Sequence, residues 1–270
     1  MDKRAEIIGF ISIKGGVGKT TVASNIAYVL AHDLDKKTLI VDGNFSAPTL
    51  NECFNIVDAE CGLVEVLAGK ERLQKAIVEI TPNLHVLPVN FYAGNVEYNQ
   101  LRPYLCSLRG KYDYILVDGS PALNDETLAT IAASDRLFIV TTPDHVTLST
   151  TLKAIKIARE KKTAISGLII NKLKDKKYEI GMTEIAEATG LPVVTSLSDN
   201  EKVLKSWAVN RITTSKYPRA NVSIESKKLA YALCGKSYRP YGVISSIGSL
   251  FNNKITQEEI NRALVNTQFY

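Results

Sequence analysis

The sequence lacks the features that mark exported, membrane-spanning and cluster-binding proteins. It has no apolar run of about 18 residues, which argues against a transmembrane helix. Its charged N-terminus passes directly into a strand-like run, unlike a signal peptide. The four cysteines, at positions 53, 61, 106 and 234, form no C-x-x-C or C-x-C pair. We therefore expect a cytoplasmic protein with neither a disulfide framework nor a metal or cluster carrier site.

The composition is otherwise that of an ordinary globular chain. Hydrophobic residues make up 45% of the 270 positions and charged residues 23%. The net charge of +5 permits anionic partners without requiring them. We find no internal repeat or low-complexity segment. This length accommodates one large α/β domain with an appendage.

The most informative stretch is the glycine-rich segment at 14–20, which has the sequence KGGVGKT. A β-branched run at 7–13 precedes it, and apolar residues near helical spacing follow between 22 and 30. Glycines between a strand and a helix let backbone N–H groups surround a phosphate, and the helix N-terminus adds its dipole. The segment therefore predicts a phosphate-binding loop. Lys19 would reach the β- and γ-phosphates, and the Thr20 hydroxyl would bind Mg²⁺.

Short apolar runs alternate with segments of helical spacing along the rest of the chain. Strands are expected at 37–42, 84–89, 112–118, 136–142, 167–171 and 192–195, and helices at 61–69, 101–108, 126–133, 147–161, 182–188 and 226–233. This alternation predicts an α/β fold in which helices cover both faces of a mostly parallel sheet. Ligands of such sheets bind at the carboxyl ends of strands, where Asp42, Asp118 and residues 141–143 all fall.

Asp118 is the clearest candidate for a metal-binding carboxylate. It ends the apolar strand at 112–118 and is followed by Gly-Ser-Pro-Ala. This context fits a Walker B aspartate that holds Mg²⁺ through water. The alternative is a strand-end aspartate that caps the next turn.

The loop departs from the strict P-loop pattern, because Ile13 stands where that pattern has glycine and Lys14 lies at the front edge. In this form it resembles the deviant Walker A motif of the MinD/ParA family of dimeric P-loop ATPases. Further pieces follow in family order: Asp42 for switch I, Asp118, Thr142-Pro143-Asp144, and Ile170-Asn171-Lys172. Tyrosine kinases of bacterial capsule systems share the fold but lack the front lysine, which argues against them.

The resemblance implies a P-loop NTPase fold, ATP and Mg²⁺ as cofactors, and a slow or partner-stimulated ATP hydrolase. It implies that Lys14 crosses a dimer interface to the partner's nucleotide and that Asp42 orients the attacking water and contacts Mg²⁺, so that Lys14, Lys19 and Asp42 take part in catalysis. Thr20, Asp42 and Asp118 would surround the metal. The residues expected to hold the nucleotide are Gly15, Gly16, Val17, Gly18, Lys19, Thr20, Thr21 and, at the adenine, Asn171.

Two departures from the family pattern bear on activity. Asn44 stands where switch I often has a second aspartate. An amide can orient water but cannot accept its proton, so slow hydrolysis is expected and a binding module with little turnover remains the alternative. The family's P-x-D segment near the base is here Leu197-Ser198-Asp199, without the proline. A simple turn role for Asn171 therefore remains open.

By resemblance, the expected function is the spatial organisation of DNA or of a cell structure by an ATP-state homodimer. A non-specific DNA or membrane surface and an activating protein are the further partners that it implies. Lys172, Lys174, Lys176 and Lys177 form a basic loop that suits DNA phosphates, although a solvated face is the favoured explanation.

The chain is expected to divide into an ATPase domain at 1–235 and a short helical C-terminal extension at 236–270. Apolar residues at 243, 244, 247, 250 and 251 form one helical stripe, and Thr256-Gln257-Glu258-Glu259 is a capping box that opens another helix. The stripe suits a membrane interface. The alternative is a helical pair docked on this chain or on a partner.

Overall fold

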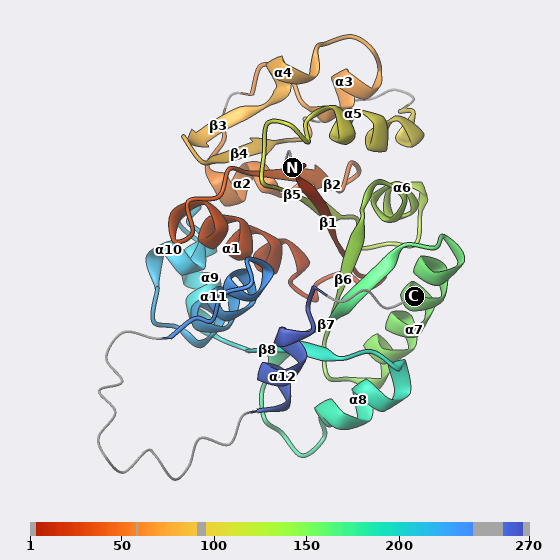
Figure 1. Ribbon diagram of the computed structural model, residues 1–270, viewed down its shortest axis with the longest axis vertical. Helices are drawn as coiled ribbons and strands as arrows, with labels where there is room; N and C mark the ends of the chain where they lie inside the picture. Colours follow the sequence, from red (N-terminus) through yellow and green to blue (C-terminus); the bar gives the residue numbers. More distant parts are fainter. Residues whose placement is uncertain (1–3, 58, 91–95, 240–255, 267–270) are drawn as a thin grey trace.

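An eight-stranded sheet forms the centre of the molecule (Figure 1). The computed structural model describes residues 4–57, 59–90, 96–239 and 256–266. The strand order is β3-β4-β2-β5-β1-β6-β7-β8, and each neighbouring pair is parallel except β3 with β4. The strands are β1 Glu6–Ile11, β2 Thr38–Gly43, β3 Val78–Thr81, β4 Leu84–Leu87, β5 Tyr114–Gly119, β6 Arg136–Thr141, β7 Ala164–Leu173 and β8 Val193–Ser198.

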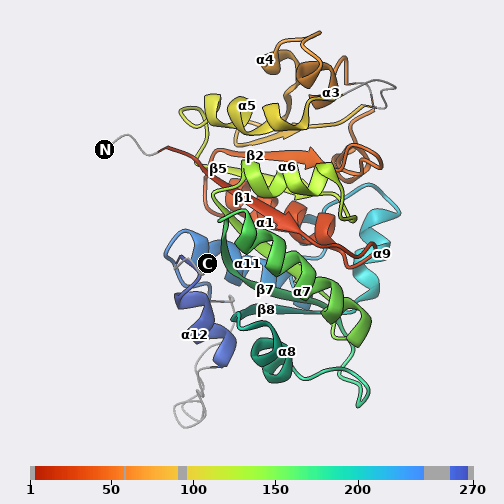
Figure 2. The ribbon, with the colours of Figure 1, turned by 90° about the vertical axis from the view of Figure 1, so that its right-hand side faces the viewer.

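Helices cover both faces of this sheet, as the two perpendicular views show (Figure 1, Figure 2). One face carries α1 Lys19–His32, α2 Leu50–Phe54, α9 Glu201–Trp207, α10 Thr213–Lys216 and α11 Asn221–Leu233. The other carries α3 Leu63–Leu67, α4 Leu73–Ala76, the 3-10 turn η1 Tyr98–Gln100, α5 Leu101–Ser107, α6 Asp125–Ala133, α7 His145–Glu160 and α8 Met182–Thr189. The predicted α/β fold is confirmed.

The central strands are apolar throughout because both of their faces are covered. Ile8 and Phe10 of β1 face the helix α1 side, whereas Ile7 and Ile11 face the opposite layer, and all four are fully buried. In the register of the sheet Asp118 of β5 is opposite both Phe10 and Asp42. The carboxyl ends of β1, β2 and β5 therefore meet at one place on the edge of the sheet.

Several short elements were not predicted. β3 pairs antiparallel with β4 at the edge of the sheet, and only four residues, with mixed exposure, form it. α9 and α10 lie between β8 and α11, where no helix was expected. Elements this short carry too few apolar positions for a period to be recognised, so tertiary packing decides them.

The capping box predicted at 256–259 is present and opens α12, Gln257–Ala263. This helix lies against the edge strand β8, where the Asn261 side-chain amide donates to the Val193 carbonyl oxygen at 2.8 Å. Arg262 Nη2 donates to Glu225 Oε2 of α11 at 2.5 Å. The docked-helix prediction therefore holds for residues 256–266. The apolar stripe at 243–251 lies outside the described residues.

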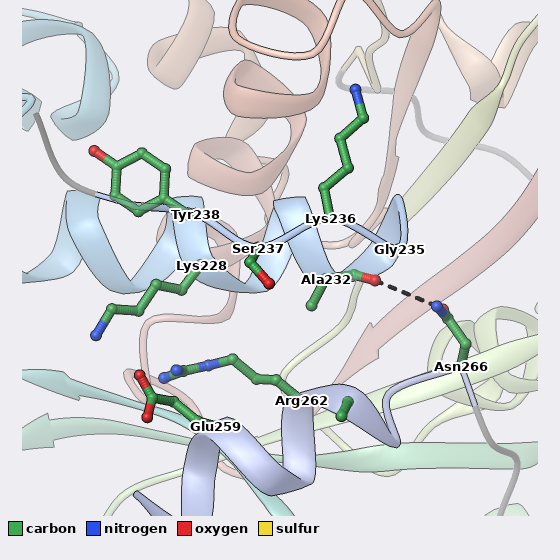
Figure 3. A pocket seen from close by; sticks show the side chains of 10 residues that line it. Lys228, Ala232, Gly235, Lys236, Ser237, Tyr238, Glu259, Arg262 and Asn266 are labelled. Carbon is green, nitrogen blue, oxygen red and sulfur yellow. Dashed lines mark hydrogen bonds between the residues drawn. The ribbon is translucent and has the colours of Figure 1, made fainter. Parts of the chain in front are cut away.

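A cleft of about 420 Å³ separates the end of α11 from α12 (Figure 3). Asn266 crosses its inner end, with Nδ2 donating to the Ala232 carbonyl oxygen at 3.2 Å. Tyr238 and Glu259 line its two sides. No helix in the described part of the chain is long and apolar enough to cross a membrane.

Arg136 fastens the end of the α12 segment to the sheet. Its side chain is 2% exposed, at the start of β6. One guanidinium nitrogen donates to the Val265 carbonyl oxygen at 2.6 Å, and another to Glu6 Oε2 at 2.6 Å. The buried charge is thus compensated by a carboxylate and a carbonyl from opposite ends of the chain.

We expect Arg136→Ala to lower the free energy of unfolding by about 3 kcal/mol, because it breaks a buried, hydrogen-bonded ion pair. Urea denaturation followed by circular dichroism measures this. The control is Lys205→Ala, whose ion pair with Glu201 is largely exposed, so that its loss should change stability far less. Equal losses in the two variants would contradict the anchoring role.

Candidate functional site

The glycine-rich loop connects β1 to α1 in the conformation that its glycines permit. Gly16 and Gly18 have φ values of +77° and +89°, in the left-handed region, and α1 begins at Lys19 directly after them. A Cβ at Gly18 would lie only 2.1 Å from Asn171 Nδ2. Position 18 therefore requires glycine for two independent reasons, backbone angle and space.

Lys19 and Thr20 both contact the Asp118 carboxylate. Lys19 Nζ lies 3.2 Å from Asp118 Oδ1, and Thr20 Oγ1 donates to Asp118 Oδ2 at 2.5 Å. Asp118 is fully buried and the Lys19 side chain is 7% exposed. Lys19 in the first turn of α1 and Asp118 at the end of β5, 99 residues apart in sequence, thus form one charged cluster.

Asp42 completes this cluster from the end of β2. It is fully buried and accepts hydrogen bonds from the backbone N–H groups of Asn44, Thr49 and Leu50 at 3.0–3.1 Å. Burial, and next the nearby negative charge of Asp118, raise the pKa of Asp42 to about 7, although the three N–H groups act in the opposite direction.

Two buried carboxylates beside threonine hydroxyls make a suitable environment for Mg²⁺. The Thr20 hydroxyl lies 3.2 Å from that of Thr49. The candidate metal ligands, two carboxylates and two hydroxyls, are therefore all oxygen groups, which Mg²⁺ prefers. Burial, and next the negative charge of Asp118, raise the pKa of Asp42, and a bound divalent cation would stabilise the ionised form of both carboxylates. The structure brings together Thr20, Asp42 and Asp118, as the sequence predicted. Thr49 was missed, because its position in a loop gave no periodic signal.

The side-chain amide of Asn44 has a hydrogen-bond partner at its nitrogen. Its Nδ2 donates to the Ala47 carbonyl oxygen, and its backbone N–H donates to Asp42 Oδ1 at 3.0 Å. The Oδ1 atom is buried and has no hydrogen-bond partner among the residues that the structure describes. A buried acceptor without a donor is costly, so this atom is suited to a ligand or a water molecule.

Lys14 points away from this cluster. Its ammonium donates to Thr147 Oγ1 at 2.7 Å and to Asp144 Oδ1 at 3.2 Å, at the N-terminus of α7. Burial opposes ionisation of Asp144, but hydrogen bonds from Thr142, Thr147 and Lys14 outweigh it and hold its pKa below the ordinary value. The Thr142-Pro143-Asp144 segment, noted in the sequence for its place in the motif order, thus binds Lys14.

Asn171 is hydrogen-bonded to the backbone of the glycine-rich loop. Its Nδ2 donates to the Val17 carbonyl oxygen at 2.7 Å, a contact that the sequence did not predict. Asp199, of the predicted Leu197-Ser198-Asp199 segment, forms an ion pair with Lys174 at 3.4 Å. The remaining predicted nucleotide-binding residues occupy the loop and the first turn of α1, namely Gly15, Gly16, Val17, Gly18, Lys19, Thr20 and Thr21.

A shallow hollow of about 320 Å³ lies on the outer side of the loop. Lys14, Gly15 and Gly16 form one wall, and Lys172 and Tyr178 belong to the opposite one. The basic segment at 172–178 thus lies beside the loop, as its place after a strand predicted.

The pKa of Asp42 gives a pH prediction for the protein without nucleotide and Mg²⁺. The folded pKa of about 7 lies above the ordinary value of 3.8 for an aspartate, so the folded state binds the proton more tightly. The contribution to stability is therefore complete below about pH 4 and is lost as pH rises through 7. We expect Asp42→Asn to unfold at a higher temperature than the wild type at pH 8, with the difference shrinking toward pH 4.

Thermal melts in EDTA between pH 4 and pH 8 measure this difference. The control is Asp35→Asn, which removes a carboxylate from the surface and should not reproduce the trend. A wild-type-like melt of Asp42→Asn at every pH would contradict the raised pKa of this buried carboxylate.

The site and the fold have counterparts in known proteins. A septum site-determining protein MinD from Pyrococcus horikoshii OT3, solved in complex with Mg-ADP, superposes with a TM-score of 0.78 at 26% identity, over 85% of this chain and 96% of that one. An uncharacterized ATP-binding protein of Methanocaldococcus jannaschii is 27% identical over 234 residues, 86% of this chain and 88% of the relative. The septum site-determining protein MinD of a Synechocystis species is 27% identical over 74% of this chain.

The model of a protein family described as AAA domain (AAA_31) matches residues 5–170, more than half of the chain. That span contains the loop at 14–20, both buried aspartates and the Asp144 segment. The chain belongs to this AAA-domain family and, within it, to the MinD/ParA group of P-loop ATPases.

Proposed function

We propose that this chain is an ATP-dependent, dimerising ATPase of the MinD/ParA type, which acts as a nucleotide switch in positioning a cell structure or partitioning DNA. The convergence of Lys19, Thr20, Asp42 and Asp118 beside the glycine loop carries the proposal. These groups provide a cation for phosphate oxygens and an all-oxygen environment for the metal that accompanies ATP.

In this proposal, the N–H groups between Gly15 and Thr21 hold the phosphates, and Lys19 exchanges part of its contact with Asp118 for the β- and γ-phosphates. Thr20, Asp42 and Asp118 surround Mg²⁺, which neutralises charge on the phosphates when it is bound. Asn171 donates one N–H of its amide to Val17, so the second N–H and the carbonyl oxygen remain available to the adenine.

Lys14 is the residue that links nucleotide state to dimerisation. It must release Asp144 and Thr147 to reach a nucleotide bound by a second copy. The ion pair with Asp144 is about 40% exposed on both sides, and such pairs contribute only about 0–1 kcal/mol. A partner's γ-phosphate is therefore a strong enough competitor for this ammonium, whereas ADP offers one phosphate fewer.

The biological role rests on the relatives. The Pyrococcus furiosus structure at 25% identity is described as a cell division ATPase MinD, and the Synechocystis relative as septum site-determining. We propose a related positioning role for this chain, with a DNA or membrane surface and an activating protein as partners. We also propose that residues 1–235 form the ATPase domain and that 236–270 form an extension specific to this chain.

Asn44 favours a second candidate, a nucleotide-gated binding module with little hydrolysis. Its amide oxygen can hold a water molecule, but it offers no negative charge and takes no proton. Phosphate release measured beside ATP-dependent dimerisation separates the two candidates. Dimers that form with ATP and release no phosphate, even with DNA or liposomes present, would establish the binding module.

We expect Lys19→Ala to weaken ATP binding by roughly 100-fold, since a hydrogen bond to a charged group contributes about 1.5–3 kcal/mol. Isothermal titration with ATP and Mg²⁺ measures the affinity. Lys153→Ala, which removes an exposed lysine of α7, is the matched control and should bind as the wild type does. Unchanged affinity in Lys19→Ala would overturn the assignment of the loop.

We expect Lys14→Ala to bind ATP with nearly wild-type affinity but to remain monomeric with a non-hydrolysable ATP analogue. Size-exclusion chromatography with light scattering, run with ADP and with the analogue, gives the oligomeric state. Lys177→Ala removes an exposed lysine of the neighbouring basic segment and should still dimerise. Dimerisation of Lys14→Ala at wild-type protein concentrations would refute the role of this lysine.

A further inference from the structure

Glu126 is a buried carboxylate to which the proposed mechanism assigns no role. It lies in the first turn of α6 and is 5% exposed. Its Oε2 accepts a hydrogen bond from Ser46 Oγ at 3.3 Å, although the two residues are 80 positions apart. Ser46 belongs to the segment between β2 and α2 that also contains Asn44. We refer to residues 43–49 as the Asn44 loop.

α6 contacts the Asn44 loop at its start as well. A Cβ at Gly43 would lie 2.9 Å from Thr130 Oγ1, so the backbone of the loop packs directly on this helix. Thr130 lies one turn beyond Glu126 and donates to the Glu126 carbonyl oxygen at 3.1 Å. Helix α6 therefore contacts the Asn44 loop at two places, Gly43 and Ser46.

An aromatic contact strengthens the outer attachment. The rings of Phe45 and Tyr98 meet edge to face, with centroids 5.1 Å apart. The turn η1, which contains Tyr98, packs against α6, which contains Glu126. Phe45 and Ser46 are thus restrained by side chains from η1 and α6, while the backbone of Asn44 is held by Asp42.

These contacts restrain the position of Asn44 Oδ1, the atom that would contact the attacking water. Asn44 Oδ1 is buried without a partner in the described structure, next to the Asp42 and Asp118 cluster. A neutral amide oxygen accepts only a weak hydrogen bond from water compared with a carboxylate. Its effect on rate therefore depends on accurate placement, since a shift of about 1 Å can cost roughly 100-fold.

We propose that Glu126 is a positioning residue for ATP hydrolysis, which acts through Ser46 to hold the Asn44 loop so that Asn44 Oδ1 orients the attacking water. The inference rests on the proposed function and deepens it. In the step concerned, the water oxygen bonds to the γ-phosphorus as the bond to the β,γ-bridging oxygen breaks. The electron pair of that bond stays on ADP, and the water proton passes to an oxygen of the released phosphate.

A carboxylate in the first turn of a helix also stabilises the helix through its dipole, so a stability measurement alone does not test the proposal. The test is a kinetic double-mutant cycle of Glu126→Ala and Ser46→Ala, together with Glu126→Gln. Glutamine retains an oxygen that accepts the Ser46 hydrogen bond, so it separates this contact from the charge.

We expect Glu126→Ala and Ser46→Ala each to lower kcat by about 10-fold with KM for ATP unchanged. The double variant should be no slower than the slower single variant, and Glu126→Gln should retain most of the wild-type kcat. Asp125→Ala, at the exposed neighbouring position, is the control. Unchanged kcat in Glu126→Ala, or additive losses in the double variant, would overturn the proposal.

If the wild-type protein binds ATP but releases no phosphate, kcat cannot be compared and a binding measurement takes its place. The probe is then ADP with Mg²⁺ and aluminium fluoride, which imitates the phosphoryl group in transfer. Glu126→Ala should bind this complex about 10-fold more weakly than the wild type and bind ADP equally well. Equal affinity for both would overturn the positioning role. Failure of the proposed function would instead appear as wild-type ATP binding in Lys19→Ala.

Discussion

The Asp118 carboxylate is the contact on which the rest of the site depends. It is fully buried at the end of β5 and reaches Lys19 at 3.2 Å and Thr20 at 2.5 Å. It is also the register partner of Asp42 on the adjacent strand. A buried carboxylate requires compensation; Lys19 pairs with Asp118, whereas Asp42 accepts hydrogen bonds from neutral backbone N–H groups. The cluster therefore has a physical reason to take up a divalent cation and a phosphate together.

Two contacts hold the glycine loop, a buried hydrogen bond from Asn171 and a partly exposed ion pair between Lys14 and Asp144. On the inner side Asn171 is bonded to Val17 and fills the space next to Gly18, which makes this side rigid. On the outer side Lys14 rests on Asp144 through an ion pair that is largely open to water. The loop thus combines a fixed backbone for binding phosphates with Lys14, whose ammonium can leave Asp144 at a small cost in free energy.

The chain extends beyond the part that it shares with a solved relative. The chain covers 96% of the P. horikoshii structure with 85% of its own residues, so part of this chain lies beyond the common fold. α12 covers the edge strand β8, and an open edge strand would offer unpaired backbone groups to other chains. Arg136, buried at the opposite side of β7, ties this cover to the start of β1 through Glu6.

Local sequence patterns are sufficient to predict the fold class, the loop at 14–20, and the positions of Asp42 and Asp118 at strand ends. Glycine spacing and runs of apolar residues are local properties, and parallel strands bring their carboxyl ends together in any such sheet. The contacts of Lys14 with Asp144, of Asn171 with Val17 and of Glu126 with Ser46 become visible only in the folded molecule. These pairs are separated by 130, 154 and 80 residues, so they depend on how whole elements pack, which no local spacing records.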